Sequence, residues 1–387
     1  MKKSPLLSIF LIVLVDVLGL TIILPLLPFY AESMGATPAT VGLLVSTYAL
    51  CQLIAGPPLG HLSDRVGRRP VLLVSQMGTC AGFIILASAR VLWIVFLARV
   101  IDGLTAGNLT VAQAYISDVT TPEQRTKSFG IIGIAFGLGF LVGPGVSGFL
   151  AQFGATYPIF AAAGLSFTSI MCTYFLLPSV QPHPDADEHN SPSRWKSYVE
   201  SFKDAQLGPM LLQFFAFTFA FSTFFSGFAL FAERRFTHNA VPFGPKEVGY
   251  LFAFSGFIGV LIQGGGMGPL VKATGESRLV QMGFATMAAG FALLSGVHGL
   301  PYLLVAIGLL TFGSAILRPS LTTLITIRAA RHRQGLVIGL MQSLMSISQI
   351  VAPVIAGLLI QSQFLSMWAL AGSLFCVIGW SLVAVTR

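Results

Sequence analysis

Long apolar stretches alternate with short polar segments along nearly the whole chain. Each apolar stretch is about 20 residues long or longer, which lets an α-helix cross roughly 30 Å of hydrocarbon. Inside lipid the backbone must satisfy its own hydrogen bonds, so helices are expected there. The pattern predicts twelve membrane-spanning helices. Their approximate bounds are 5–30, 39–60, 70–89, 91–116, 128–150, 156–178, 208–231, 247–270, 278–297, 300–325, 335–361 and 364–385.

The composition agrees with an all-α integral membrane protein. Of the 387 residues, 55% are hydrophobic and only 9% are charged, whereas about 25% are charged in an ordinary soluble domain. The first stretch follows Lys2 and Lys3, as a signal peptide would. It is long, however, and it contains Asp16 and two prolines without a clear small-residue cleavage site, so we interpret it as a retained first span.

Positive charge is concentrated on one side of the predicted membrane. With an even number of spans and an N-terminus inside, most of the 22 basic residues fall in cytoplasmic segments, and only Arg99 and Arg318 fall inside spans. Cytoplasmic loops carry an excess of Lys and Arg. We therefore expect both termini in the cytoplasm and the spans in a plasma membrane, the inner one in a bacterium. The net charge of +8 then reflects topology and not a nucleic-acid site.

One long polar stretch separates the first six predicted spans from the last six. It begins with closely spaced prolines and acidic residues, as a linker does. Residues 194–204 then place aromatic side chains at helical spacing, which suggests either a short surface helix or a solvated tether. We expect an N-terminal half at 1–180, a linker at 181–206 and a C-terminal half at 207–387.

Weak internal similarity suggests that the two halves are related. The segment at 60–68, after the second span, has a degraded counterpart at 268–276, after the eighth. Gly143-Pro144 in the fifth span likewise corresponds to Ala352-Pro353 in the eleventh. Two pseudo-symmetric six-helix halves are the arrangement of a transporter that rocks around a site near the midplane.

The loop between the second and third spans carries a specific motif. From Gly60 it reads Gly-His-Leu-Ser-Asp-Arg-Val-Gly-Arg-Arg. Gly60 permits a close helix approach, and Gly67 suits a tight turn. Arg65, Arg68 and Arg69 favour the cytoplasmic side. The whole loop resembles the signature loop of the major facilitator superfamily.

That resemblance implies the fold and a role for the loop. It implies twelve helices in two halves, with the loop acting as a cytoplasmic latch that breaks as the halves rock. Asp64 is placed to cap a helix N-terminus, and Asp118, at the end of the fourth span, is a candidate partner for an arginine of the loop. The alternative is a loop that is basic for topology alone.

Two of the 14 acidic residues, Asp16 and Asp102, fall inside predicted spans. A charge at the bilayer centre costs about 2.5–3.5 kcal/mol on insertion scales, so such residues are usually functional. The stretch from Asp16 to Pro28 resembles the first-span motif of the tetracycline-efflux-like group. The stretch from Arg99 resembles the proton-coupling motif of the family, although related exporters usually have a neutral residue where Asp102 stands.

Two interpretations of these acids remain open. Either carboxylate, Asp16 or Asp102, could carry the coupled proton, with Arg99 as part of the coupling site. Arg99 and Asp102 are three residues apart and so share a helix face. They could instead be a purely structural pair that neutralises its own charge.

The fifth span resembles the antiporter motif of drug/proton exchangers. Small residues four apart let two helices pack backbone to backbone, and a proline bends the span. Ser147 replaces the first glycine of the closing pair. The residues that carry the resemblance are Gly130, Gly139, Gly143, Pro144 and Gly148.

The second half offers an aromatic and amide-bearing surface. Phenylalanines follow one face of the seventh span, where they either form a core or lipid face or line a binding wall. Arg318 is the only charge inside the spans of this half; it either lines the cavity or snorkels to the inner surface. The predicted cavity residues are Gln52, Gln213, Phe217, Phe221, Phe224, Arg318, Gln342 and Gln349.

We conclude from the sequence that the chain is a secondary active transporter, and we favour a proton-coupled exporter of amphipathic small molecules or drugs. A symporter or facilitator that imports a metabolite is the alternative. No nucleophile–base set or phosphate loop indicates an enzyme, and no soluble domain indicates a sensor. The four cysteines lie singly and imply neither disulfide nor metal. We expect a monomer in the lipid bilayer that binds substrate and protons and needs no cofactor.

Overall fold

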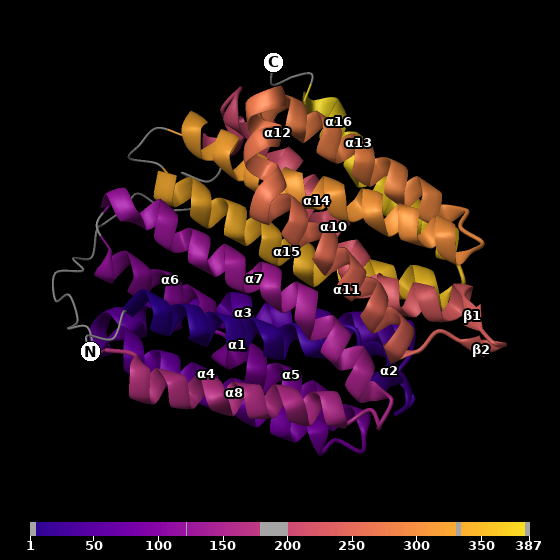
Figure 1. Cartoon of the computed structure of the whole chain (residues 1–387), viewed down its shortest axis with the longest axis horizontal. Helices are drawn as coiled ribbons and strands as arrows, with labels where there is room; N and C mark the ends of the chain where they lie inside the picture. Colours follow the sequence, from indigo (N-terminus) through magenta and orange to yellow (C-terminus); the bar gives the residue numbers. More distant parts are fainter. Residues whose placement is uncertain (1–4, 121, 179–199, 330–333, 384–387) are drawn as a thin grey trace. The chain divides into compact units, whose positions relative to one another are not determined.

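The computed structural model describes residues 5–120, 122–178, 200–329 and 334–383. This part of the chain is nearly all helical (Figure 1). It contains twelve helices that are long and apolar enough to cross a membrane. The predicted all-α membrane fold with twelve spans is therefore confirmed.

The first six spans consist of eight helices, because two spans are interrupted. Pro25 lies in the turn that separates the first two helices, where its missing N–H and fixed φ do not suit a continuous helix. These elements are α1 (Pro5–Ile23), α2 (Leu27–Glu32), α3 (Pro38–Val66), α4 (Arg68–Ala87), α5 (Leu92–Thr105), α6 (Asn108–Val119), α7 (Pro122–Ala151) and α8 (Tyr157–Leu176).

The described part of the second half contains six further spans, a two-stranded hairpin between the seventh and eighth spans, and a π-helical turn. The hairpin pairs Thr237 with Pro242 and His238 with Val241. The π-helical turn η1 interrupts the eighth span. These elements are α10 (Leu207–Arg235), β1 (Thr237–His238), β2 (Val241–Pro242), α11 (Pro245–Leu261), η1 (Ile262–Gly266), α12 (Met267–Thr274), α13 (Glu276–Ser295), α14 (Leu300–Arg328), α15 (Gln334–Gln361) and α16 (Leu365–Val383).

The chain forms two compact units. Unit 1 takes the described residues within 1–36, 44–189 and 244–256, and unit 2 takes those within 37–43, 190–243 and 257–387. The predicted boundaries at 180 and 207 stay a prediction. Most of the predicted linker, including residues 194–199 of the suggested surface helix, lies outside the described residues.

Unit 1 packs α1 against α7 and α8, and α4 against α5 and α8. Its core contains fully buried aliphatic side chains of α1 such as Ile9 and Ile12, together with Tyr115 of α6. The contact between α1 and α7 is unusually close. A Cβ added to Gly139 would lie 2.5 Å from Cγ1 of Val17, and Thr21 Oγ1 donates a 2.9 Å hydrogen bond to the Gly139 carbonyl.

Unit 2 is organised around α10, which packs against α15 and α16. Its phenylalanine rings stack on partners from the last span: Phe219 lies 4.0 Å from Phe375, and Phe231 lies 4.8 Å from Trp368, between ring centroids. Trp368 is fully buried. Much of the aromatic stripe of α10 is thus core.

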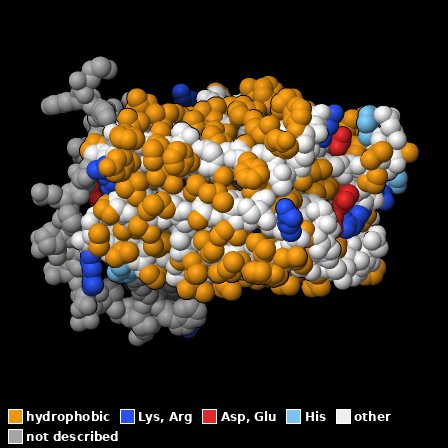
Figure 2. Space-filling view, turned by 90° about the horizontal axis from the view of Figure 1, so that it is seen from below, with side chains coloured by type: hydrophobic (Ala, Val, Ile, Leu, Met, Phe, Trp, Pro, Cys, Tyr) orange, Lys and Arg blue, Asp and Glu red, His pale blue; other side chains and the backbone are white. Residues whose placement is uncertain are grey.

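The face drawn in Figure 2 has the distribution of side chains that helices in contact with lipid require. Hydrophobic side chains cover most of its middle, and charged side chains gather mainly toward its two ends. Large apolar side chains such as Phe175, Trp93 and Ile327 are more than half exposed. Apolar atoms exposed on this scale need a partner other than water.

Candidate functional site

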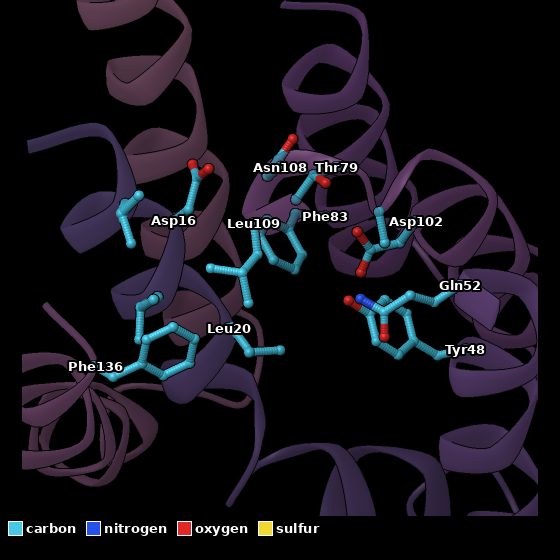
Figure 3. Close-up of a pocket in the computed structure, with 13 residues that line it drawn as sticks. Asp16, Leu20, Tyr48, Gln52, Thr79, Phe83, Asp102, Asn108, Leu109 and Phe136 are labelled. Carbon is cyan, nitrogen blue, oxygen red and sulfur yellow. The ribbon is translucent and has the colours of Figure 1, made fainter. Parts of the chain in front are cut away.

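A pocket in unit 1 brings together acidic, amide, hydroxyl and aromatic side chains (Figure 3). They come from five of the first six spans. Three residues predicted from the sequence, Asp16, Gln52 and Asp102, lie in its wall. The pocket is lined by Val13, Asp16, Val17, Leu20, Tyr48, Gln52, Thr79, Phe83, Asp102, Ala106, Asn108, Leu109 and Phe136.

Asp16 is surrounded by hydrogen-bonding groups from three other helices. Ser169 of α8, Gln76 of α4 and Asn108 of α6 have side chains within hydrogen-bonding reach of its carboxylate. Among the described residues no cation pairs with it. Gln76 and Ser169 are themselves fully buried. Asp16 therefore sits in a polar cluster in which neutral dipoles, and not an opposite charge, stabilise it.

Asp102 has a different partner. Arg99 Nη2 lies 3.3 Å from Asp102 Oδ2, and both side chains are 5% exposed. The Arg99 guanidinium also lies over the Tyr48 ring, 5.8 Å from its centroid, and Thr79 is a further hydrogen-bonding neighbour of the carboxylate. The ion pair expected from the spacing of three is present, and it makes both charges tolerable away from water.

The fourth span breaks at the pocket. The sequence predicts one helix over 91–116, but α5 ends at Thr105 and α6 begins at Asn108. Between them Ala106 has φ −73° and ψ 58°, which is not helical. The N-terminus of α6 and its partial positive charge consequently lie beside Asp16, which Asn108 reaches. The break places Ala106, Asn108 and Leu109 in the pocket wall.

The signature loop forms a network within unit 1. Arg68 Nε donates a 2.8 Å hydrogen bond to Asp118 Oδ2, and its Nη1 lies 2.5 Å from Asp64 Oδ1. The turn between α3 and α4 rests on Gly67, whose φ of 103° suits only glycine. The close helix approach expected at Gly60 is absent, because no described atom lies within 4 Å of the place its Cβ would take.

The other two arginines of the loop differ in their surroundings. Arg69 donates a hydrogen bond to the Tyr174 carbonyl, and its guanidinium lies 5.6 Å from the Tyr174 ring centroid. Arg65 is exposed. A latch role for the loop stays a prediction.

The glycines of the fifth span make backbone contacts in unit 1. Gly139 and Gly143 face Val17 and Thr21 of α1, one and five residues after Asp16. At the other end of α7, a Cβ added to Gly148 would lie 2.9 Å from the carbonyl oxygen of Lys246 at the start of α11. Pro144 is inside the helix. Gly130 belongs to the part of α7 whose side chains lie outside the described residues.

The other predicted cavity residues belong to unit 2. Gln213, Phe217 and Phe224 of α10 are buried, at 2%, 2% and 5% exposure, and Phe221 and Gln349 are partly buried. Arg318 and Gln342 are exposed. A common substrate cavity for all eight residues stays a prediction.

Sequence reasoning missed four polar residues of the site: Gln76, Asn108, Ser169 and Thr79. A signal was available, because each interrupts an apolar run inside a predicted span. Isolated Ser, Thr and Asn residues are common in membrane helices, however, and only their convergence on one carboxylate distinguishes these.

Comparisons with known proteins agree on one family. The model of the Major Facilitator Superfamily matches residues 9–266 and 243–387. The class B tetracycline resistance protein of Escherichia coli is 30% identical over 92% of this chain and 88% of its own length. Multidrug resistance protein 2 of Bacillus subtilis (strain 168) is 27% identical over 91% and 88%.

Solved structures share the fold. The human organic anion transporter MFSD10 (TETRAN) has a TM-score of 0.73 at 22% identity, covering 98% of each chain. The nucleoside transporter NupG has a TM-score of 0.76 at 14% identity and covers 100% of each. These structures show the shared fold, and the sequence matches confirm the predicted resemblance to the tetracycline-efflux-like group.

Proposed function

The chain belongs to the Major Facilitator Superfamily and is a multi-pass membrane transporter of small molecules, and from this premise we propose that it exports amphipathic compounds in exchange for protons. Its relatives are named as tetracycline and multidrug resistance proteins. Export would proceed by alternating access, with the halves 1–180 and 207–387 rocking about the central spans.

The observation that carries the proposal is the pocket with two carboxylates in different electrostatic settings. Asp102 is held by Arg99, at 3.3 Å. The hydrogen-bonding neighbours of Asp16 in the described part of the chain, Ser169, Gln76 and Asn108, are neutral. A carboxylate without a cation can gain or lose a proton at a lower electrostatic cost than one in an ion pair. We therefore assign the exchanged proton to Asp16 and a fixed negative charge to Asp102.

Proton and substrate movement are coupled because the proton and the substrate compete for Asp16 within the pocket. A proton from outside neutralises Asp16 and weakens its hold on a polar or cationic part of the substrate, which then leaves. After the protein reopens inward, a polar or cationic part of new substrate stabilises the ionised Asp16 carboxylate and so favours release of the proton. Each ligand thus shifts the population of conformations that the other prefers.

The proposed orientation of the protein in the membrane follows from the distribution of its basic residues. The signature loop and both termini face the cytoplasm of the plasma membrane, which is the inner membrane in a bacterial cell. The latch pair of Arg68 and Asp118 is then on the cytoplasmic side. We take the monomer as the working unit.

The test is transport into proteoliposomes under an imposed pH gradient, with tetracycline and the dye ethidium as probes. An acidic lumen should drive accumulation of at least one probe by the wild-type protein. Asp16→Asn should abolish accumulation while the protein inserts normally. Asp204→Asn is the matched control, because this exposed carboxylate lies before α10 and accepts the backbone N–H groups of Gln206 and Leu207.

Two outcomes would overturn the proposal. Accumulation driven by an acidic exterior would mean symport, which is the alternative function. Full gradient-driven exchange by Asp16→Asn would remove the proton from this carboxylate, whether or not Asp102→Asn also retains exchange.

A further inference from the structure

Arg318 is a cation inside a membrane span, and none of the described carboxylates pairs with it. It lies in the apolar helix α14, ten residues before its end. Its Nη2 contacts the thioether sulfur of Met345 at 3.3 Å, and the side chain is otherwise accessible. No carboxylate of the described residues forms an ion pair with it. A sulfur atom is a weak acceptor and leaves the charge uncompensated.

Unit 2 holds no carboxylate that could compensate this charge at membrane depth. Its acidic residues are Glu200, Asp204, Glu233 and Glu276. The first two precede α10, the third is in the last turn of α10, and the fourth begins α13. All four therefore lie at or beyond the ends of spans. An unpaired charge within a span is costly and is kept where it serves a function.

The surroundings of Arg318 are polar along one side of α14. Ser314 and Thr322 lie one turn before and one turn after it, and both are partly exposed. Leu317 and Leu321, one residue before and three residues after Arg318, are fully buried and flank this polar stripe on one side. A stripe of hydroxyls and a guanidinium is not what a lipid-facing surface presents. This side of α14 thus faces a space that admits polar groups.

The opposing helix contributes a face of matching character. Met345 of α15 touches Arg318, and Gln342 and Gln349 lie three residues before and four residues after Met345, on the same side of that helix. Gln342 is exposed and Gln349 is partly exposed. Two amide groups therefore flank the contact, with the apolar side chain of Met345 between them.

We propose that Arg318 binds an acidic group of the substrate, a carboxylate, sulfonate or phosphate carried on an apolar body. This inference rests on the proposed function, because the ligand is the transported compound. The guanidinium presents paired N–H donors that match the two oxygens of such a group. The hydroxyls of Ser314 and Thr322 already donate to carbonyls of their own helix, so Arg318 supplies the charged donors.

The apolar body of the ligand has a place beside the guanidinium. Met345 is unbranched and polarisable, so it adapts to aromatic rings of different shape. The amides of Gln342 and Gln349 can donate to a third oxygen of a sulfonate or phosphate. Charge at Arg318 and adaptable apolar contact at Met345 together select amphipathic anions over neutral compounds of the same size.

The test compares two probes with the same ring system and nearly the same size: naphthalene-2-sulfonate, which stays ionised, and naphthalene-2-sulfonamide, which is neutral. Their affinities for the full-length protein in lipid nanodiscs are measured by isothermal titration calorimetry. The wild-type protein should bind the sulfonate about tenfold or more tightly than the sulfonamide, as expected for charge-assisted hydrogen bonds. Arg318→Gln should remove this preference, and Arg318→Lys should retain part of it.

Arg328→Gln is the matched control, because it removes the same charge from the same helix. Arg328, at the end of α14, donates a 2.8 Å hydrogen bond to Gln206. The preference for the sulfonate should survive in Arg328→Gln. A preference that survives in Arg318→Gln, equal binding of the two probes by the wild-type protein, or no saturable binding of the sulfonate would each overturn the proposal.

The proposed function is tested by a different measurement, transport under a proton gradient. If the wild-type protein prefers the sulfonate but moves no compound under a proton gradient, the anion site stands and the exporter proposal falls. If Arg318→Gln loses the preference and still exports ethidium, both proposals stand, because ethidium has no acidic group for Arg318 to bind.

Discussion

Gln76 Nε2 of α4 donates a 2.7 Å hydrogen bond to Ser169 Oγ of α8, and both side chains are fully buried next to Asp16. This contact ties the third span to the sixth beside the carboxylate of the first. The amide and hydroxyl are held in place by each other, so their dipoles are fixed before Asp16 gains or loses a proton. Such preorganised dipoles act more strongly in a water-poor setting than in water.

The first prediction concerns Ser169→Ala. The hydroxyl supports the ionised form of Asp16, so its removal should favour the protonated form. The pH at which proton-driven export is half-maximal should therefore rise by roughly half to one unit, the equivalent of one hydrogen bond. The measurement is export rate against pH in proteoliposomes.

Ser166→Ala is the control for that experiment. Ser166 lies on the same helix and donates to the Gln76 carbonyl at 3.4 Å, and it is not a neighbour of Asp16. Its pH profile should match the wild type. An unshifted profile in Ser169→Ala would exclude the hydroxyl from tuning the carboxylate.

The second prediction concerns the ion pair in the pocket wall. Arg99→Gln leaves the buried Asp102 carboxylate without its cation, which should cost about 3–5 kcal/mol of stability. Asp102→Asn leaves the guanidinium unpaired and should cost a similar amount. The double variant should be more stable than the sum of the two losses predicts, because it buries no charge. Unfolding in detergent, followed by tryptophan fluorescence, completes the cycle; strictly additive losses would mean that the two charges do not interact.

The third prediction compares two glycines of the signature loop. Gly67 has a φ of 103°, so Gly67→Ala forces a side chain into a backbone conformation that costs roughly 1–3 kcal/mol. Gly60→Ala meets no atom of the described residues within 4 Å and lies within a helix, where alanine is favoured over glycine. Thermal unfolding midpoints of the purified variants should fall for Gly67→Ala and stay or rise for Gly60→Ala. The reverse order would show that close packing, and not the turn, requires glycine in this loop.

The parts of the fold that depend on one helix at a time were predictable from the sequence. Apolar runs located the spans, and a separation of three residues placed Arg99 beside Asp102. The contact of Asp118 with Arg68 was expected from the resemblance of the loop to its family. Each of these inferences needs only local geometry or a conserved type of motif.

What could not be predicted depends on how helices meet. Asp16 collects Gln76, Asn108 and Ser169 from positions 60 to 153 residues away in the chain, and no periodicity in one span indicates which other span will face it. The break after Thr105 was missed for the same reason. Its flanks contain no proline, and Gly107 lies against Ser75 of the neighbouring helix, which is a tertiary contact.

Because the fourth span is interrupted, its polar pocket residues belong to two separate helices, α5 and α6. Asp102 and Arg99 belong to α5, whereas Asn108, whose side chain reaches Asp16, belongs to α6. No regular helical ladder of hydrogen bonds joins the two across Ala106. A small change of angle at this joint would move Asn108 relative to Asp16 without disturbing the ion pair. Bending of the fourth span at this break would therefore change the surroundings of the Asp16 carboxylate and leave those of the Asp102 carboxylate unchanged.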